Sequence, residues 1–319
     1  MKSFETSGSR VATLLAAVIM LLGSLQLQAQ TPKEWKQLKG DVTLYMANDL
    51  GRNGYYDQKP IAELMGEMAK TTGMECVLAV GDIHHFNGVA SVNDPLWMTN
   101  FEQVYSHPEL MLDWFPVLGN HEYRGNTQAV LDYSKVSRRW MMPARYYTKV
   151  FEEDGFSLRL VWLDTTPLIS KYRSDDKYAD AALQNDTLQL AWADSVLASS
   201  REDWVVVMGH HPVYAHTYKE ESERADLQQR LDPILRRHHV DMYVCGHIHN
   251  FPHLRVDGSD LDYVVNSAAS LSRVPEAVEG TVFCSAEPGF SILSADSLTL
   301  TLRMIDGHGR VLHAVERRH

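Results

Sequence analysis

The chain has 319 residues, of which 45% are hydrophobic and 22% are charged, and its formal net charge is −11 at pH 7. This composition is ordinary for a soluble globular protein, and the length is sufficient for one large core or two small ones. An acidic chain without a basic tract is poorly suited to a polyanionic partner, so we expect no nucleic-acid binding. A small phosphorylated substrate is compatible with this charge if a local positive centre exists.

Residues 1–29 have the pattern of a secretory signal peptide. A basic segment precedes an apolar stretch at residues 11–25, and the small residue Ala29 provides a cleavage point. The alternative is an N-terminal membrane anchor, but the apolar stretch is shorter than the roughly 20 residues that span a bilayer. We therefore expect a secreted or periplasmic protein without stable membrane insertion. Residues 30–319 are expected to form a single domain.

Strand-like apolar runs recur along the chain, and several of them end in polar residues. In chain order these runs are "VTLYMANDLG", "CVLAVGD", "WFPVLGNHE", "LRLVWLDTT", "WVVVMGHHP" and "MYVCGHIH". The candidate ligands at their ends are Asp49, Asp82, Asn120, His121, His210, His247 and His249. Ligands of α/β sheets gather at the carboxyl ends of the strands, so these side chains are expected to converge on one cleft.

Helical periodicity separates several of these runs. Three apolar stripes have the spacing of a helix face: Ile61, Leu64, Met65 and Met68; Leu188, Ala191 and Trp192; and Leu227, Leu231, Ile234 and Leu235. Near the C-terminus, "DYVVNSA", "GFSILSA", "SLTLTLRMI" and "RVLHAVE" predict antiparallel strands, with "DGHG" as a turn between the last two. Strands that alternate with helices and are followed by a run of strands indicate an α/β sandwich with mixed sheets.

The three cysteines do not form a disulfide framework. Cys76 and Cys245 lie inside apolar runs, where a buried free thiol is the expected state, and Cys284 lies elsewhere. An oxidising compartment would allow one pair, but an odd count leaves at least one thiol unpaired.

The signal for metal chemistry lies in the ordered set of motifs and not in any one of them. Alone, the Asp-x-Gly that begins at Asp49 and the Gly-Asp that ends at Asp82 fit a turn or a cap. The Gly-Asn-His-Glu of residues 119–122 places an amide oxygen beside an imidazole. The two imidazoles of residues 246–249 can share a site only where the strand ends in a loop, which the glycine permits. With the Gly-His that ends at His210, these make five motifs after apolar strands, and together they predict a metal site.

This arrangement resembles the calcineurin-like metallophosphoesterases, and within them the small purple acid phosphatases of the tartrate-resistant type. The resemblance covers nearly the whole chain after residue 29 and includes "FNGV", "NDPLWMTNFEQVYS", "VLGNHEYRGN", "YSKVSRRW", "GHHPV" and "CGHIHN". It implies a four-layer αββα sandwich of two mixed β-sheets flanked by helices.

The resemblance also implies a site with two metal ions. By motif position, the ligands would be Asp49, Asp82 and His249 for the first metal, and Asp82, Asn120, His210 and His247 for the second. Mixed carboxylate, amide and imidazole ligands suit Zn, Mn or Fe better than Ca or Cu(I). In the family mechanism a metal-activated hydroxide attacks a phosphomonoester in line, and His121 would donate a proton to the leaving group. The alternative is that His121 only orients Asn120 or the phosphate.

The second motif departs from the purple acid phosphatases at His85. In that family the motif is Gly-Asp-x-x-Tyr, and the tyrosine phenolate binds ferric iron; here the position of the tyrosine is occupied by His85. Three anionic ligands around Fe(III) and a divalent ion leave a formal charge of about +2, and two anionic ligands around two divalent ions leave about the same. We therefore expect His85 to bind the first metal in a divalent centre that is not purple. The alternative is that His85 points away.

The loop after His210 holds the candidate for substrate binding. In relatives, histidines in this loop can approach the substrate, which makes His216 a candidate, while a surface position is the more common interpretation for both His211 and His216. The sequence thus predicts a metal-dependent phosphatase. The alternatives are a phosphodiesterase or nucleotide hydrolase on the same fold, and a metal-binding protein that has lost activity.

Overall fold

The computed structural model describes residues 32–217, 221–266 and 269–319. The predicted signal peptide at residues 1–29 lies outside the described residues. Within the described part of the chain, no helix combines the length and apolar character needed to cross a membrane.

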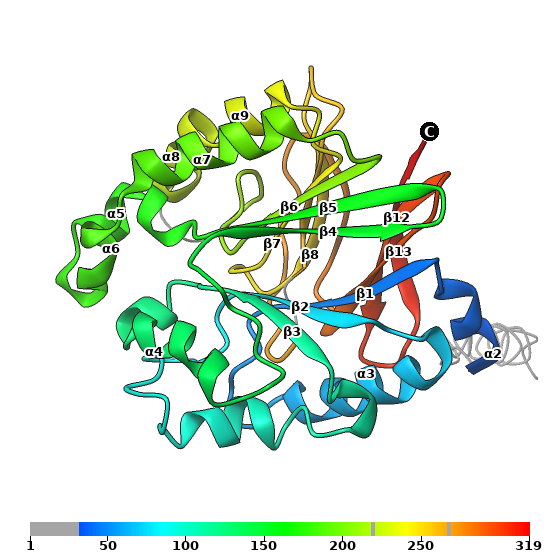
Figure 1. Cartoon of the computed structure of the whole chain (residues 1–319), viewed down its shortest axis with the longest axis horizontal. Coiled ribbons are helices and arrows are strands. Elements are labelled where there is room, and N and C mark those ends of the chain that lie inside the picture. The colour runs from blue at the N-terminus through cyan, green and yellow to red at the C-terminus, as the bar shows by residue number, and fades with distance from the viewer. Residues whose placement is uncertain (1–31, 218–220, 267–268) are drawn as a thin grey trace, which may run out of the picture.

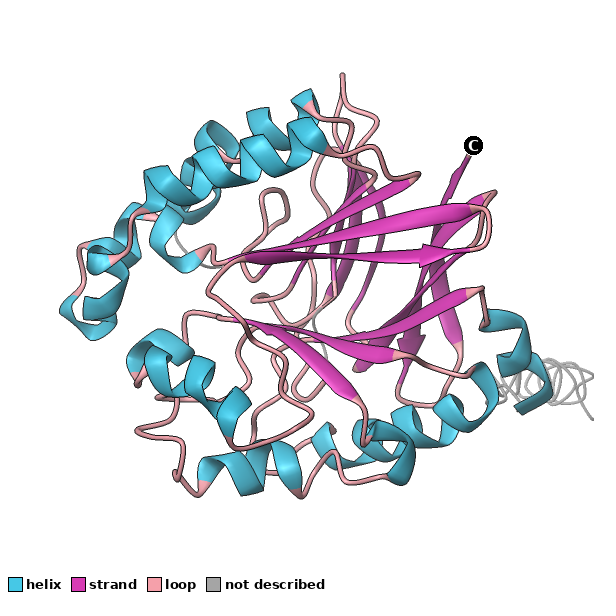
Figure 2. Cartoon of the chain, in the orientation of Figure 1, coloured by secondary structure: helices cyan, strands magenta, loops and turns pink. Residues whose placement is uncertain are grey.

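Two mixed β-sheets form the centre of the molecule (Figures 1 and 2). The first sheet has the order β13-β12-β11-β1-β2-β3, and the second has the order β10-β8-β9-β7-β6-β5-β4. The strands of the first sheet are β1 (Val42–Ala47), β2 (Cys76–Val80), β3 (Asp113–Val117), β11 (Gly289–Ala295), β12 (Thr299–Asp306) and β13 (Val311–Arg318). Those of the second are β4 (Tyr147–Glu153), β5 (Phe156–Leu163), β6 (Trp204–Gly209), β7 (Met242–Cys245), β8 (Phe251–Arg255), β9 (Asp262–Val265) and β10 (Thr281–Ser285).

Helices cover the outer face of each sheet. The first sheet is flanked by α3 (Gln58–Thr72) and α4 (Thr127–Asp132), and the second by α7 (Asp186–Ser199), α8 (Glu221–Arg230) and α9 (Asp232–Arg237) (Figure 1). Three shorter helices are α2 (Pro32–Trp35), α5 (Ser170–Arg173) and α6 (Ala179–Leu183). The four-layer sandwich predicted from the sequence is confirmed.

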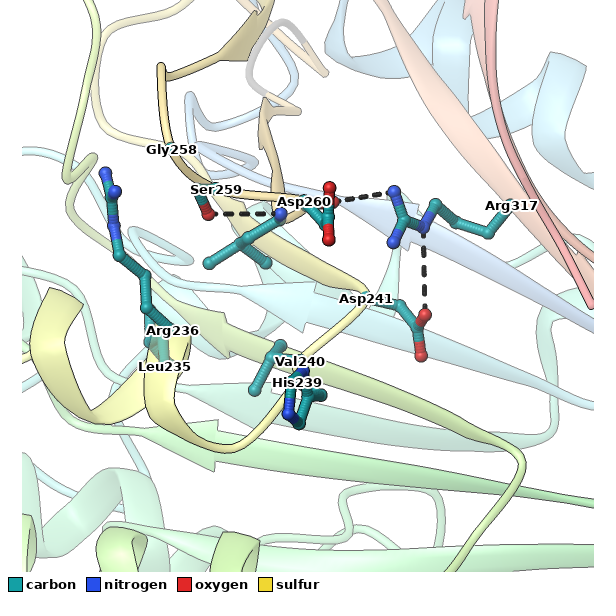
Figure 3. Close-up of a pocket in the computed structure, with 10 residues that line it drawn as sticks. Leu235, Arg236, His239, Val240, Asp241, Gly258, Ser259, Asp260 and Arg317 are labelled. Carbon is teal, nitrogen blue, oxygen red and sulfur yellow. Dashed lines mark hydrogen bonds and ion pairs between the residues drawn. The ribbon is translucent and has the colours of Figure 1, made fainter.

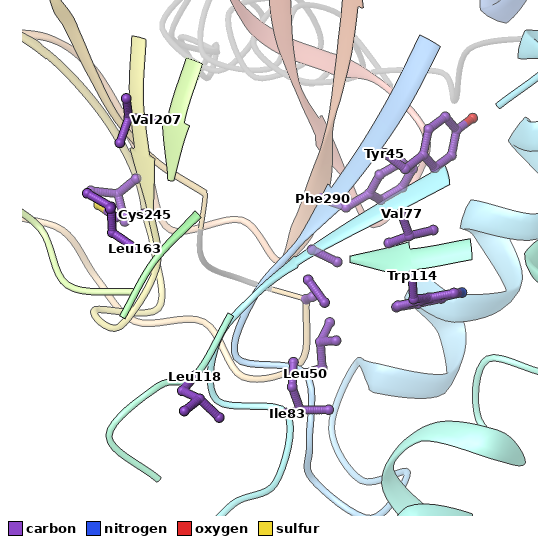
Figure 4. Close-up of a cluster of buried hydrophobic side chains, with 14 of the residues drawn as sticks. Tyr45, Leu50, Val77, Ile83, Trp114, Leu118, Leu163, Val207, Cys245 and Phe290 are labelled. Carbon is purple, nitrogen blue, oxygen red and sulfur yellow. The ribbon is translucent and has the colours of Figure 1, made fainter. Parts of the chain in front are cut away.

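The apolar strands are buried on both faces, which explains their continuous hydrophobic runs. On β1, Val42, Leu44 and Met46 belong to the core between the two sheets, together with side chains of β5, β6 and β7. The alternate residue Tyr45 faces the helical side, where its ring stacks on Phe290 at 5.2 Å (Figure 4). Both cores are therefore built from the period-two alternation of the same strands.

Parallel strands carry the predicted ligands to one region of the fold. β1, β2 and β3 are parallel neighbours in the first sheet, and β5, β6, β7 and β9 are parallel neighbours in the second. The segments that follow β1, β2, β3, β6 and β7 contain all of the motifs named above. Their apolar residues Leu50, Ile83 and Leu118 are fully buried in the helix-side core and anchor these loops (Figure 4).

Some sequence-based expectations are corrected by the structure. Leu188 is 57% exposed, because α7 buries Gln189, Ala193 and Leu197 instead of the predicted stripe. The third stripe is divided between α8 and α9, with Leu231 between the two helices. "DYVVNSA" contains β9, which is parallel to β7 and antiparallel only to β8. The sequence analysis does not predict the strands β4, β8 and β10.

Candidate metal centre

Four predicted ligands occupy unusual backbone conformations at strand ends. The φ angles of Asp49, Asp82, His247 and His249 are 52°, 53°, 77° and 61°. Positive φ is uncommon for residues other than glycine and costs on the order of 1–3 kcal/mol. Such conformations cluster at functional sites, where they direct side chains that an extended strand would point elsewhere.

In each of Asp49 and Asp82, one carboxylate oxygen accepts a backbone hydrogen bond and the other lies near an imidazole. Asp49 accepts a hydrogen bond from the backbone N–H of His247 through Oδ2 at 2.9 Å, and Asp82 accepts one from the N–H of His121 through Oδ1 at 2.9 Å. The second oxygen of each carboxylate faces imidazoles. Asp49 Oδ1 lies 3.2 Å from His249 Nε2, and Asp82 Oδ2 lies 3.1 Å from His210 Nε2.

His85 lies beside the residues that the sequence predicts for the first metal. Its Nε2 is 3.5 Å from Asp82 Oδ2, and its ring centroid is 5.6 Å from that of His249. One candidate ligand atom of each of Asp49, His85 and His249 falls within 4.8 Å of the others, and the same holds for Asp49, Asp82 and His210. The structure therefore brings these five residues together, with His85 directed inward.

Every imidazole of the site is oriented by a partner on its other nitrogen. The Nδ1 atoms of His85, His121, His210 and His249 contact backbone carbonyl oxygens at 3.0, 2.7, 3.0 and 2.7 Å. A carbonyl can only accept, so Nδ1 carries the proton and Nε2 presents a lone pair to the site. His247 is oriented in the opposite sense, because its Nε2 is 2.9 Å from Glu223 Oε2, so Nε2 carries the proton and Nδ1 is the acceptor nitrogen. Such partners fix the tautomer of metal-binding histidines.

Glu223 was not predicted from the sequence. It lies on α8, and its carboxylate also accepts hydrogen bonds from Lys171 Nζ at 2.9 Å and from the hydroxyl of Tyr172 at 3.1 Å. Its side chain is 5% exposed and that of His247 is fully buried. A glutamate in a polar helix gives no signal for this role, since the contact depends on how α8 packs.

Glu122, the last residue of the Gly-Asn-His-Glu motif, organises the loop that carries Asp82. Its carboxylate accepts hydrogen bonds from the backbone N–H groups of Asp82, His84 and Gly119 at 2.9, 3.0 and 2.7 Å. Burial, followed by the charge of Asp82, raises the pKa of Glu122 to about 8. Glu122 thus holds two strand-end loops in a fixed relation without facing the ligand atoms.

Asp82 and His210 shift the pKa values of each other in opposite directions. Burial alone would raise the pKa of Asp82, but the charges of His210 and His121 outweigh it and hold that pKa well below its usual range. Burial lowers the pKa of His210, yet Asp82 more than offsets this and raises it to about 9. Asp82 therefore favours a positive charge at His210 Nε2, and a metal ion would supply that charge in place of a proton.

A buried oxygen of Asn120 is a further reason to expect a metal ion at this site. Asn120 Oδ1 is buried and has no hydrogen-bond partner among the described residues. A buried amide oxygen without a partner is costly, and a cation would satisfy it. Carboxylate oxygens, an amide oxygen and imidazole nitrogens together form a donor set suited to Zn, Mn or Fe.

His121 lies beside this donor set. Its Nε2 is 3.8 Å from Asp82 Oδ2, and its ring centroid is 4.1 Å from that of His85. Burial lowers the pKa of His121 to about 2, and Asp82 opposes this only in part. With Nδ1 bound to the carbonyl of Phe86, Nε2 is the atom that faces a substrate.

Two histidines after β6 differ from each other in position. A surface position for His211 is wrong: it is 1% exposed, its Nδ1 contacts Thr165 Oγ1 at 2.8 Å, and its ring lies 4.4 Å from that of His247. It is buried because the chain turns inward directly after the strand. His216 is 38% exposed at its side chain and pairs with Glu276 at 3.4 Å, outside the group of ligand atoms described above.

The paired residue His84 has a packing role. Its ring contacts Trp97 edge-on at 4.5 Å, and its Nδ1 is 3.3 Å from Asn100 Nδ2. Asp164, the acidic residue that follows β5, is not among the grouped ligand atoms. It accepts a hydrogen bond from the hydroxyl of Tyr123 at 2.5 Å. Cys76 and Cys245 are buried free thiols, as expected, and Cys284 is also free.

A separate cavity of about 300 Å³ lies next to α9 and the turn between β8 and β9. Arg317, which lines it, already has partners: it contacts Asp241 at 3.7 Å and donates to the carbonyl of Asp260 at 2.6 Å (Figure 3). None of the residues of the metal motifs lines it. The strand-end centre is therefore the better candidate for the functional site.

Comparison with known proteins agrees with this geometry. The family model for calcineurin-like phosphoesterases matches residues 42–251. The chain is 35% identical over 217 residues to tartrate-resistant acid phosphatase type 5 of Sus scrofa, a match that covers 66% of this chain and 62% of that protein. It is 30% identical over 265 residues to the Homo sapiens protein of the same name, covering 77% of this chain and 81% of that protein. The match thus spans less than two thirds of the pig protein but more of the human one.

Solved structures share the fold. GAP50 of Plasmodium, described as the anchor in the inner membrane complex, superposes with a TM-score of 0.74 at 20% identity, covering 88% of this chain and 89% of that one. Purple acid phosphatase PPD1 from yellow lupin (Lupinus luteus) superposes with a TM-score of 0.60 at 15% identity, covering 87% of this chain and 53% of that one. The motifs, their geometry and the family match lead to one conclusion: the chain belongs to the calcineurin-like phosphoesterase family.

Proposed function

We propose that this protein is a two-metal phosphomonoesterase of the acid phosphatase type. The observation that carries the proposal is the convergence of Asp49, Asp82, His85, His210 and His249 from both sheets, with buried nitrogen and oxygen lone pairs directed at one another. The similarity to tartrate-resistant acid phosphatases supports the same activity.

The residues divide into two ligand sets. Asp49, Asp82, His85 and His249 would hold the first ion, and Asp82, Asn120, His210 and His247 the second, with Asp82 as the bridge. Because His85 replaces a phenolate by a neutral imidazole, both ions are proposed to be divalent, either Zn, Mn or Fe(II). The inward position of His85, 3.5 Å from the proposed bridge, supports its role as a ligand.

When bound, two such ions lower the pKa of a coordinated water and offset the charge of the phosphoryl oxygens. The chain itself orients every imidazole through Nδ1 carbonyl contacts or through Glu223, so the ligands are positioned before metal binding. His121 presents Nε2 beside Asp82 while the Phe86 carbonyl holds its Nδ1. The negative charge of a bound phosphate would favour a proton on Nε2, and from this position His121 is proposed to donate that proton to the leaving group.

The experiment that tests the function is phosphoester turnover with and without metal. Protein stripped by a chelator should lose hydrolysis of p-nitrophenyl phosphate and regain it with Zn, Mn or Fe(II). Turnover of the bis(p-nitrophenyl) ester should be lower than that of the monoester. Faster hydrolysis of the bis-ester would identify a diesterase, and tight metal binding without hydrolysis of either ester would identify a protein that has lost activity.

The role of His121 has its own test. In His121→Asn, the amide nitrogen can keep the hydrogen bond to the Phe86 carbonyl, while the atom that corresponds to Nε2 is lost. The variant should bind both metals yet lose roughly 10²–10⁴-fold in turnover on esters with poor leaving groups. His238→Asn is a matched control, since His238 pairs with Asp194 outside the site. Unchanged rates in His121→Asn would refute the proton-donor role.

Residues 1–29 are proposed to direct export and to be removed. N-terminal sequencing of protein recovered from outside the cytoplasm should begin near residue 30. A mature protein that keeps Lys2 would contradict this.

A further inference from the structure

A cavity of about 440 Å³ opens directly beside His85. The residues that line it are Arg52, Asn53, Tyr55, Tyr56, His85 and Phe86. They come from the two loops that follow β1 and β2 and so continue from the residues next to Asp49 and Asp82. A substrate whose phosphate lies at the metal centre would extend into this space.

Arg52 is a buried cation that lines this cavity. It is 6% exposed, and its Nε has no hydrogen-bond partner among the described residues. Its backbone N–H is fixed by Gln58 Oε1 at 3.0 Å, and its guanidinium lies 5.0 Å from the centroid of the Phe86 ring. No carboxylate lies within 4 Å of the guanidinium in the described part of the chain. A desolvated cation without such a partner needs an anion to be stable.

The charges around Arg52 suggest that it binds an anion when the metal ions are present. Burial lowers the pKa of Arg52, and the negative charges of Asp49 and Asp82 oppose this, whereas Arg273 acts with burial. Once two divalent ions occupy the centre, the charges of these aspartates are committed to the metals. With such ions bound, the guanidinium would face a positive centre, and a phosphate dianion would compensate that charge. Arginine is suited to this because its planar fork binds phosphate oxygens in pairs.

The outer part of the cavity is aromatic and uncharged. Tyr55, Tyr56 and Phe86 are 72%, 61% and 65% exposed, although large aromatic side chains are usually covered. The centroid of the Phe86 ring lies 6.1 Å from that of His85 and 6.2 Å from that of His121, next to the proposed metal centre. Exposed apolar surface beside a polar centre is typical of a ligand-binding wall. Arg52 is the only residue among those lining the cavity that carries a permanent charge.

We propose that Arg52 and Phe86 form the substrate subsite of this enzyme, in which Arg52 binds a phosphoryl oxygen and Phe86, with Tyr55 and Tyr56, holds a planar aromatic leaving group. The substrate class is therefore an aryl phosphomonoester, such as a tyrosine phosphate. A diphosphate fits less well, because a second phosphate would need another cation in the aromatic part of the cavity. This inference rests on the proposed phosphomonoesterase function.

The test compares O-phosphotyrosine with O-phosphoserine in Phe86→Leu, a change of an exposed side chain that leaves the core intact. The ratio of kcat/KM for the two substrates should fall by roughly two- to tenfold, as expected for loss of one aromatic contact. Tyr146→Leu is the matched control, since Tyr146 packs on Trp192 in the outer helical layer and should leave the ratio unchanged.

Arg52 is tested by phosphate binding as well as by rate. In Arg52→Gln, titration of inorganic phosphate into metal-loaded protein should show a dissociation constant raised roughly 10- to 100-fold, and KM should rise for both esters, with the metal content unchanged. Arg52→Lys keeps the charge and should recover part of the binding, which also covers the case in which the glutamine variant does not fold.

The outcomes separate the two proposals. If the wild type hydrolyses no phosphoester, the proposed function fails. If it hydrolyses both esters but Phe86→Leu leaves their ratio unchanged, or if pyrophosphate is hydrolysed faster than phosphotyrosine, the aromatic subsite is refuted while the phosphatase function stands. Unchanged phosphate affinity in both Arg52 variants would refute the role of Arg52.

Discussion

Replacing Glu223 by glutamine should weaken metal binding at the proposed second position without changing a proposed ligand. Glu223 Oε2 and His247 Nε2 are 2.9 Å apart, and both side chains are buried. A glutamine keeps one acceptor oxygen, which Lys171 and Tyr172 would retain, and turns an N–H₂ group toward His247. Two donors would then face each other, so His247 would move its proton to Nδ1 and lose the lone pair that a metal needs.

The expected loss of metal affinity follows from the loss of the carboxylate that orients His247. Removal of a group that orients a metal-bound histidine lowers metal affinity roughly 10- to 100-fold, or about 1.4–2.8 kcal/mol. Competition with a chelator should show this loss for one of two ions, and the other should be held as in the wild type. Turnover at saturating metal should recover, since the ligand itself is present.

The control is a carboxylate and histidine pair outside the site. Asp194 contacts His238 Nε2 at 2.6 Å, but the aspartate side chain is 41% exposed. Asp194→Asn should leave both metal affinities unchanged. Equal affinities in wild type and Glu223→Gln would refute the argument that the carboxylate sets the tautomer of His247, as would equal losses at both metal positions.

Three further changes test separate parts of the structure. In Gly119→Ala, a Cβ would lie 2.2 Å from Asp82 Oδ1 and 2.5 Å from its backbone nitrogen, so we expect loss of bound metal, and metal content equal to that of the wild type would contradict the geometry. His85→Ala should reduce the metal retained after dialysis from two ions toward one, whereas two retained ions would show that His85 is not a ligand. In Asn185→Ala, loss of the cap in which Asn185 accepts from the Leu188 N–H at 2.9 Å should cost about 1 kcal/mol of unfolding free energy with turnover unchanged; no change in chemical denaturation would contradict it.

The metal motifs were predictable because each is local. Asp49, Asp82 and His210 stand one or two residues past an apolar strand, and parallel strands bring such positions to one edge. The same reasoning explains the inward position of His85, which is fixed three residues after Asp82. Glu223 was not predictable, because its contact with His247 depends on the packing of α8, a helix with no apolar pattern that marks the site.

Helix boundaries and faces were predicted less well. The spacing of Leu227, Leu231 and Leu235 predicts one long helix. Instead, a new helix begins at Asp232, with Pro233 in its first turn. The burial of Gln189 in α7 is a tertiary effect, since its amide exchanges hydrogen bonds of 2.8 and 2.9 Å with the backbone of Asp164. No periodicity of apolar residues reports such a polar anchor.

The most direct test of the central claim is a metal titration of the stripped protein that follows p-nitrophenyl phosphate hydrolysis and the visible spectrum together. A binuclear divalent centre predicts that the rate rises until two equivalents per chain are bound and that no purple absorption develops. Full activity at one equivalent, no activity at any metal concentration, or a purple protein with stoichiometric ferric iron would contradict it.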